Sequence, residues 1–265
     1  MNATTITPSA ASAMRLTERV PAQPAVSAPA VALRDVRKVH GQGDASVVAL
    51  DGISVALSSA SFTAIMGPSG SGKSTFLHIA AGLDRPTSGT VALGDTELTR
   101  LSERRLTILR RERIGFVFQA FNLMPSLTVT QNIGLPLRLD GRRLRRSEVR
   151  EAAGRVGLGE RLGHRPAQLS GGQQQRVAIA RSLINDPYII LADEATGNLD
   201  SATSEEIMTM LGRLNDAGKT IIMVTHEDDI AAHAKRIIRM RDGLIIDDGP
   251  SPRMLQAQGG LVSTA

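Results

Sequence analysis

Hydrophobic residues along the chain fall into short continuous runs that alternate with helical patterns. Two runs, 188–192 and 220–225, are rich in aliphatic and β-branched residues, and a third, 61–66, leads directly into a glycine-rich segment. Apolar runs of this length are typical of parallel strands that are buried on both faces. The helical pattern over 201–215 separates the first two runs, as a β-α-β crossover requires. The pattern therefore predicts an α/β fold with a mostly parallel sheet.

Other segments complete the expected order of elements. Strands are predicted at 31–39, 47–57 (after the loop 41–44), 114–118, 236–240 and 244–248, and a helix at 73–83. The region 129–183 is expected to be mainly helical, with breaks at Pro136, Gly141 and Pro166. Residues 1–30 lack any period and are rich in Ala, Thr, Ser and Pro, so we expect a disordered tail there and a polar C-terminal tail over 251–265.

Composition narrows the class of protein. Hydrophobic residues make up 42% and charged residues 22% of the chain, which is close to the average of soluble globular proteins. No apolar run reaches the length of about 18 residues that predicts a membrane span, and we expect no signal peptide. The chain has no cysteine, which excludes disulfides and thiolate metal sites and fits a reducing cytoplasm.

The net charge of +5 is unevenly distributed. Residues 100–165 contain 15 arginines and 6 acidic residues, a balance of +9 that leaves −4 for the rest of the chain. A solvated helical face is the first interpretation of this segment, and attraction to an anionic membrane surface or to an acidic partner is the alternative. Nucleic acid is not expected as a partner, because five Phe and one Tyr offer little aromatic surface for stacking bases.

The glycine-rich segment after 61–66 matches the pattern G-x-x-x-x-G-K-[ST] between a strand and a helix. Its residues, with the one that follows, are Gly67, Pro68, Ser69, Gly70, Ser71, Gly72, Lys73, Ser74 and Thr75. In such a loop the backbone N–H groups and the helix N-terminus face phosphate oxygens. Lys73 is expected to reach the β- and γ-phosphates of a nucleotide, and the Ser74 hydroxyl to bind Mg²⁺.

Polar residues that end the predicted strands point to the chemistry of the site. Asp193 and Glu194 follow the run 188–192, and the carboxyl ends of parallel strands form the ligand side of such a sheet. Asp193 suits coordination of Mg²⁺, and Glu194 can orient and polarise an attacking water. His226 follows 220–225 and could hydrogen-bond the γ-phosphate, while Gln119 follows 114–118 and could reach Mg²⁺ or the water.

A second phosphate cradle is predicted at Ser170, Gly171, Gly172 and Gln173. Ser170 is a favourable N-cap, and two glycines at a helix start leave backbone N–H groups accessible to an anion. One nucleotide has a single γ-phosphate, and Lys73 already serves it. The second cradle is therefore expected to close on the nucleotide of another copy.

Together these motifs resemble those of the ATP-binding cassette (ABC) ATPase family over roughly residues 31–250. Residues 169–173 resemble its signature motif, 193–194 its Walker B pair, Gln119 its Q-loop, 197–200 its D-loop and His226 its switch histidine. The residues of segments 118–125, 81–84 and 196–201 resemble those of one branch of the family. This branch contains macrolide-efflux, lipoprotein-release and antimicrobial-peptide-resistance ATPases, alongside the cell-division ATPase.

The resemblance implies a fold, a ligand and partners. It implies a P-loop core with an antiparallel β-subdomain and an inserted helical subdomain at roughly 120–185. It implies ATP and Mg²⁺, catalysis by Glu194, His226 and Gln119, and contact of Asp200 with the nucleotide. Two cassettes would pack head to tail beneath an integral-membrane permease on a separate chain, at the cytoplasmic face of the membrane. Gln119 and the basic segment 100–165 would contact that permease.

Two alternatives remain open at this point. A cell-division type of ATPase would regulate cell-wall enzymes through its permease without transport, and the sequence does not separate it from a transporter subunit. A cassette ATPase acting on DNA or ribosomes is less favoured, because such proteins usually carry a coiled-coil insertion or two cassettes in one chain.

Three positions depart from the family pattern. His40 stands where the family usually has an aromatic residue that stacks on adenine, so His40 is expected to contact the base. Ala60-Ser61 replaces a common Gly-Glu turn, and an alanine in a left-handed turn would be strained. Ala195 stands where a proline usually follows the catalytic glutamate.

Overall fold

The computed structural model describes residues 29–259. Most of the expected N-terminal tail, 1–28, lies outside these residues. Its last residue, Ala30, is fully buried and accepts a hydrogen bond from the backbone N–H of Gly94, so the folded part begins before Val31. Within the described residues no helix is long and apolar enough to cross a membrane.

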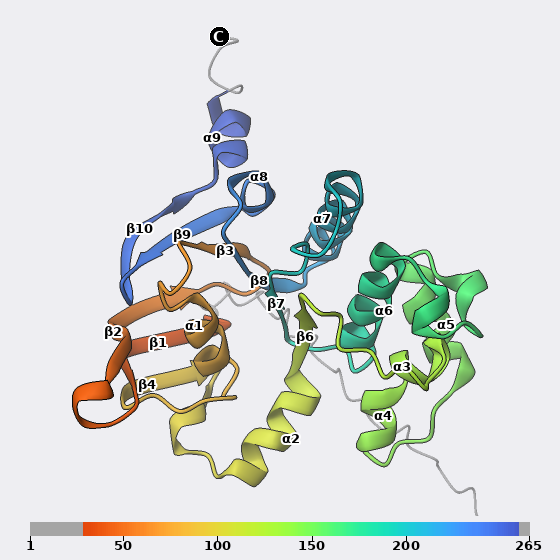
Figure 1. The fold of residues 1–265 in the computed structure, drawn as a ribbon, viewed down its shortest axis with the longest axis horizontal. Helices are drawn as coiled ribbons and strands as arrows, with labels where there is room; N and C mark the ends of the chain where they lie inside the picture. The colour runs from red at the N-terminus through yellow and green to blue at the C-terminus, as the bar shows by residue number, and fades with distance from the viewer. Residues whose placement is uncertain (1–28, 260–265) are drawn as a thin grey trace, which may run out of the picture.

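A six-stranded sheet forms the centre of the molecule (Figure 1). Its order is β10-β9-β3-β8-β7-β6, and all neighbours are parallel except the β9–β10 hairpin. The strands are β3 (Phe62–Met66), β6 (Ile114–Phe118), β7 (Ile189–Asp193), β8 (Thr220–Thr225), β9 (Arg236–Arg241) and β10 (Leu244–Pro250). The predicted parallel sheet is confirmed, and every residue of β3 and β8 is buried.

A second, antiparallel sheet has the order β2-β1-β4-β5. Its strands are β1 (Val31–His40), β2 (Val47–Leu57), β4 (Ser88–Leu93) and β5 (Thr96–Glu97). β1 and β2 fall where the sequence predicts them, whereas β4 and β5 carry no prediction. β4 starts with three exposed residues and has only two buried ones, so its apolar pattern is weak.

Helices cover both faces of the central sheet (Figure 1). Their bounds are α1 (Lys73–Ala80), α2 (Glu103–Arg113), α3 (Val129–Ile133), α4 (Leu135–Leu139), α5 (Arg146–Arg155), α6 (Gly171–Leu183), α7 (Ser201–Asp216), α8 (Asp228–Ala231) and α9 (Pro252–Gly259). Alternate residues of β3 point to opposite faces. Phe62 packs in the core with α6 and α7, whereas Ile65 packs with α1 and the antiparallel sheet. This two-sided core fixes the edge at which the parallel strands end.

Two predicted boundaries are wrong, each for a local reason. The first helix ends at Ala80 rather than at residue 83, because Gly82 adopts a left-handed conformation that ends helices (φ 62°). Pro136 does not break the helical region, since it lies in the first turn of α4, where a missing N–H is tolerated, and the break falls at Gly134. The predicted polar C-terminal tail contains a helix, α9, over its first part.

Candidate functional site

The predicted nucleotide residues gather where three parallel strands end. Met66 of β3 is paired with Thr225 of β8, and Asp193 of β7 is paired with Val224 of β8. The segments that leave these strands therefore meet at one edge of the sheet. They line a cavity of about 810 Å³ that contains Gly67, Pro68, Ser69, Gly70, Gly72, Lys73, Ser74, Thr75, Glu194 and His226.

The glycine-rich loop takes a path that only glycine permits at two points. Gly67 has φ 154°, and a Cβ there would lie 2.2 Å from the carbonyl oxygen of Met240. Gly72 has φ 98°, and its Cβ would lie 2.3 Å from the carbonyl oxygen of Ala49. Because Gly72 caps α1 without a side-chain acceptor, the N–H groups of the first turn stay available to a ligand. The loop thus forms a cradle of backbone donors.

Lys73 lies inside this cradle and bonds to the loop itself. Its Nζ donates to the carbonyl oxygens of Gly67 and Pro68, both at 2.8 Å, and the residue is 7% exposed. Burial lowers the pKa of Lys73 below the ordinary 10.5, although the carboxylates of Glu194 and Asp193 act in the opposite direction. Among the residues that the structure describes, the buried Ser71 Oγ finds no hydrogen-bond partner. An ammonium group, open N–H groups and an unpaired hydroxyl fit a phosphate chain.

Ser74, which lines the cavity, holds its hydroxyl beside a carboxylate oxygen of Asp193, which is not part of the lining. Ser74 Oγ and Asp193 Oδ1 are 3.5 Å apart. Burial raises the pKa of Asp193, as does the nearby Glu194. No group of three acidic or histidine side chains among the described residues could hold a metal alone. A hydroxyl and a carboxylate suit Mg²⁺, which commonly takes few protein ligands together with substrate phosphates and water.

Glu194 and His226 form a pair above the loop. His226 Nδ1 lies 3.0 Å from Glu194 Oε1, and the imidazole is 56% exposed while the carboxylate side chain is 27% exposed. Glu194 adopts φ 46°, an uncommon conformation for this residue, and its N–H donates to the carbonyl oxygen of Val224. The hydrogen bond to β8 holds this backbone in place and directs the carboxylate towards the histidine. The pair can hold and polarise a water next to the phosphate cradle.

Gln119 and Asp200 are engaged elsewhere in this structure. Gln119 Nε2 donates to Asn198 Oδ1 at 3.5 Å, and Asn198 Nδ2 donates back to the Gln119 carbonyl oxygen at 3.0 Å. Asp200 caps α7 by accepting from the backbone N–H and the hydroxyl of Thr203. These two bonds lower the pKa of Asp200. Neither residue lines the cavity of Lys73, so their predicted contacts with the nucleotide remain proposals.

The predicted second cradle lies in a separate cavity. Ser170, Gly172 and Gln173 line a hollow of about 600 Å³ that shares no lining residue with the cavity of Lys73. Ser170 Oγ accepts from the N–H of Gln173, while Gln173 Oε1 accepts from the N–H of Ser170. This capping box leaves the N–H groups of Gly171 and Gly172 without an intrahelical partner. Gly171 faces Leu199, next to the segment that bonds Gln119.

The contact of His40 with the base stays a prediction. His40 does not belong to the lining, although it is paired across the β1–β2 ladder with Val47, which does. Val47 is 63% exposed and Val48 is 39% exposed, so both present apolar surface to the cavity. Arg239 also lines it. The two exposed valines at the start of β2 were not predicted from the sequence as part of this cavity.

Known proteins resemble the chain in sequence. The family described as "ABC transporter" matches residues 50–197. The chain is 51% identical over 216 residues to the macrolide export ATP-binding/permease protein MacB of Bdellovibrio bacteriovorus, covering 82% of this chain and 33% of the relative. It is 50% identical to an uncharacterized ABC transporter ATP-binding protein of Thermotoga maritima, covering 80% of this chain and 92% of the relative. The chain thus spans about a third of the MacB relatives.

A solved structure matches the fold as well. It is a dimeric post-hydrolysis state of the ATP-binding cassette MJ0796 bound to ADP and Pi, with a TM-score of 0.76 and 44% sequence identity over 83% of this chain and 98% of that chain. The chain therefore belongs to the ABC transporter family, as one of its ATP-binding cassettes.

Proposed function

We propose that the chain is the ATP-binding and ATP-hydrolysing subunit of an export system and drives an integral-membrane permease carried on a separate chain. The cavity at the strand ends carries this proposal, because it combines a phosphate cradle with the Glu194–His226 pair. Relatives of cassette length that are named ATP-binding proteins support the separate permease. The working position would be peripheral, at the cytoplasmic face of the membrane.

The phosphate chain of ATP would enter the loop and replace its internal bonds. Lys73 Nζ would leave the carbonyl oxygens of Gly67 and Pro68 and bind the β- and γ-phosphates. Ser74 and Asp193 would hold Mg²⁺. The metal would supply neutralisation of negative charge on the phosphate oxygens. The apolar surface of Val47 and Val48 would receive the base, in place of the predicted His40.

Hydrolysis requires a water in line with the γ-phosphate. Glu194 would accept a hydrogen bond from this water and orient it, and His226 would fix the carboxylate from 3.0 Å away. The rigid backbone of Glu194, bonded to β8, keeps this geometry while the nucleotide binds. Gln119 would join the site only by leaving Asn198, a change that could follow contact with the permease.

A second copy of the chain would complete the site. The cavities of Lys73 and Ser170 are separate within one molecule, so one nucleotide cannot use both. In a head-to-tail pair each nucleotide would lie between Lys73 of one copy and the capped helix start at Ser170 of the other. The dimeric MJ0796 structures support this arrangement. Closure on ATP and reopening after hydrolysis would move the permease.

The replacement Glu194→Gln tests the assignment. We expect ATP binding to persist, turnover to fall by about 10²–10⁴-fold, and ATP to trap a dimer on size exclusion. Glu112→Gln is the matched control, because Glu112 is exposed on α2 and lies away from the cavity. If Glu194→Gln turned ATP over at the rate of the control, Glu194 would lose its role. Export assayed with and without the co-purified permease tests the transport step separately.

A further inference from the structure

Six exposed arginines lie close together in the sequence, from the end of α4 through the following loop into α5. Residues 138–150 contain only two acidic residues. We define the 138–150 basic surface by Arg138, Arg142, Arg143, Arg145, Arg146 and Arg150, all of which are exposed. Within the part of the chain that the structure describes, none of these six side chains forms an ion pair or a hydrogen bond. Their charges are therefore available to an external partner.

The acids that could neutralise this surface are few and already constrained. Asp140 accepts from Arg111 Nη1 of α2 at 2.8 Å, so a further arginine satisfies it. Glu148 is half-buried and shares a hollow of about 510 Å³ with Arg142, Arg143 and Arg145. With six arginines and two acidic residues, the segment 138–150 has a balance of +4, whereas the chain outside residues 100–165 carries −4.

The Arg111–Asp140 pair also joins the surface to α2. In Figure 1 α2 and α4 lie at the same lower edge of the molecule. α2 adds two exposed arginines, Arg104 and Arg105, which form no ion pair within the described residues. The basic surface therefore extends over two elements on one edge, rather than lying on a single helix.

Apolar side chains are exposed within this basic edge. Leu139 is 68% exposed, directly before Asp140, and Ile108 is 42% exposed, one helical turn before Arg111. The ion pair therefore brings two apolar residues to the same edge as the arginines. Exposed aliphatic side chains surrounded by arginines are typical of surfaces that rest on the headgroup region of an anionic bilayer.

We propose that the 138–150 basic surface binds anionic phospholipid headgroups directly, with Leu139 inserted at the interface. A lipid surface fits better than an acidic protein segment, because the arginines are spread over a loop and two helices and need no matched acceptor spacing. A bilayer offers phosphates at every spacing, and it also accepts the exposed leucine. This contact would hold the cassette against the membrane in addition to any contact with a permease.

Binding of the full chain to vesicles tests the proposal without permease or nucleotide, so it can fail while the proposed ATPase function stands. We expect sedimentation with vesicles of equal parts phosphatidylglycerol and phosphatidylcholine, and none with phosphatidylcholine alone. Salt at about 1 M, where the screening length is about 3 Å, should release the chain. Inorganic phosphate at the same ionic strength should release it no better than chloride.

Matched triple variants decide whether the placement of charge matters. Replacing Arg142, Arg143 and Arg145 by Gln should weaken partitioning onto anionic vesicles by roughly a hundredfold, since each basic residue near the surface contributes about fivefold. The control replaces Arg34, Arg213 and Arg241, which are also exposed and unpaired within the described residues, and should bind nearly as the parent does. Leu139→Ser should weaken binding without changing its dependence on salt.

Three results would overturn the lipid assignment. They are equal losses in both triple variants, absence of binding to anionic vesicles, and equal binding to neutral vesicles. If the Arg142, Arg143 and Arg145 variant bound vesicles normally but lost its permease, the surface would recognise an acidic protein segment instead. Unchanged circular dichroism and ATP affinity in each variant would confirm that the fold is intact.

Discussion

Lys73 is a charged side chain that the fold buries before any ligand binds. Burial lowers its pKa below 10.5, so the folded protein loses this proton more readily than an unfolded chain. Folding therefore carries a cost for the buried ammonium at neutral pH, and the cost is relieved as pH rises through the lowered pKa. Phosphate binding needs the charged form. We expect ATP affinity to fall by up to about tenfold per pH unit, starting below pH 10.5.

The variant Lys73→Arg is the control for this pH dependence. A guanidinium keeps its charge to above about pH 12, so any residual affinity of the variant should stay flat over the same alkaline range. Isothermal titration with ATP across that range measures both proteins. Parallel pH profiles for the two would show that another group controls the alkaline limb.

Local pattern predicts the phosphate loop well and the surroundings of the site poorly. The loop follows from residue types at fixed spacing, and Asp193, Glu194 and His226 follow from their place after buried strands. The contacts that the Gln119 and His40 side chains make could not be predicted in this way. The side chain of Gln119 bonds to Asn198, 79 residues later, and the base end depends on how β2 enters the cavity. Such contacts are set by tertiary packing.

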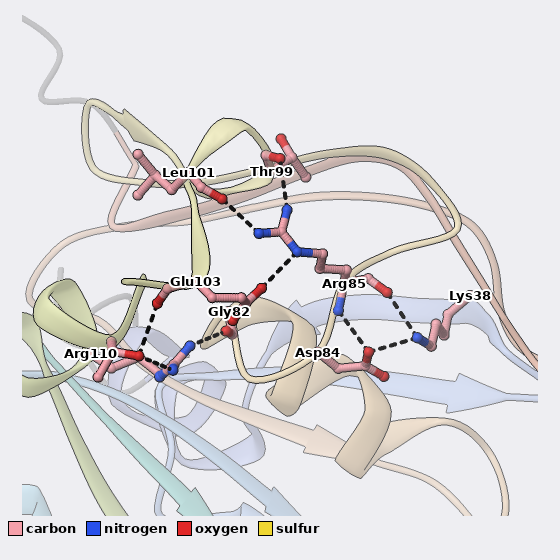
Figure 2. Close-up of polar contacts among 9 residues, drawn as sticks. Lys38, Gly82, Asp84, Arg85, Thr99, Leu101, Glu103 and Arg110 are labelled. Atoms are coloured by element: carbon pink, nitrogen blue, oxygen red, sulfur yellow. Dashed lines mark hydrogen bonds and ion pairs between the residues drawn. The ribbon is translucent and has the colours of Figure 1, made fainter. Parts of the chain in front are cut away.

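Among the elements, the start of α2 is joined to the segment that follows α1 by a polar network around Arg85 (Figure 2). The Arg85 guanidinium donates to the carbonyl oxygens of Thr99 and Leu101 and to Glu103 Oε1. Lys38 Nζ donates to Asp84 Oδ1 and to the Arg85 carbonyl oxygen. Burial acts to raise the pKa of Asp84, but the hydrogen bonds from Lys38 and from the backbone of Arg85 outweigh it and hold the pKa below 3.8.

Replacing Arg85 by Ala should loosen α2 rather than unfold the protein. The change removes the donors of two backbone carbonyls and one ion pair, at a cost of about 1–2 kcal/mol, or roughly 2–4 °C of melting temperature per kcal/mol. Hydrogen exchange should rise in α2 and stay unchanged in β8. Arg34→Ala is the control, because its exposed side chain has no partner within the described residues. Equal melting temperatures for the two variants would contradict this role.

The start of α6 combines a structural cap with a proposed contact to nucleotide. Ser170→Ala removes the cap and should cost about 1 kcal/mol, whereas Ser170→Asp keeps an N-cap acceptor and should retain the stability of the parent. Both variants should lose ATP-dependent dimerisation, because Ala lacks the hydroxyl that would bind the phosphate and Asp repels the phosphate. Thermal unfolding and size exclusion separate the two roles. An active dimer with Asp at this position would remove Ser170 from the site.

Elements with a strong apolar pattern could be predicted from the sequence, whereas α2, β4 and β5 could not. The bounds of β6 and β8 agree with the predicted runs. Buried and mainly β-branched residues fill β8, and β6 combines buried Ile114 and Val117 with two phenylalanines. α2 was not predicted, since only Leu106 of its eleven residues is buried and arginines make up half of the rest. The hydrogen bonds of Arg85 and Arg110 hold α2 in place, and they connect residues that lie far apart in the sequence.

At the scale of the whole molecule, the proposed nucleotide site is divided between two separate cavities, one around Lys73 and one around Ser170. In a two-fold symmetric pair this arrangement makes an isologous interface, in which the Lys73 surface of each copy meets the Ser170 surface of the other. This contact occurs twice in the pair, so each copy would donate one half to each site.

Mixing two inactive variants tests this sharing. In a pair of Lys73→Met and Ser170→Arg copies, one site combines both lesions, and the other combines the intact loop with the intact helix start. Random mixing in equal amounts should therefore restore about a quarter of the parental ATPase activity. The double variant mixed with an equal amount of parent chain is the control. Its mixed dimers carry one lesion in each site and should be inactive, so only the parental dimers, about a quarter of the total, should hydrolyse ATP. If each copy completed its own site, the two single variants would stay inactive together, while the double variant would leave half of the sites in every mixed dimer working.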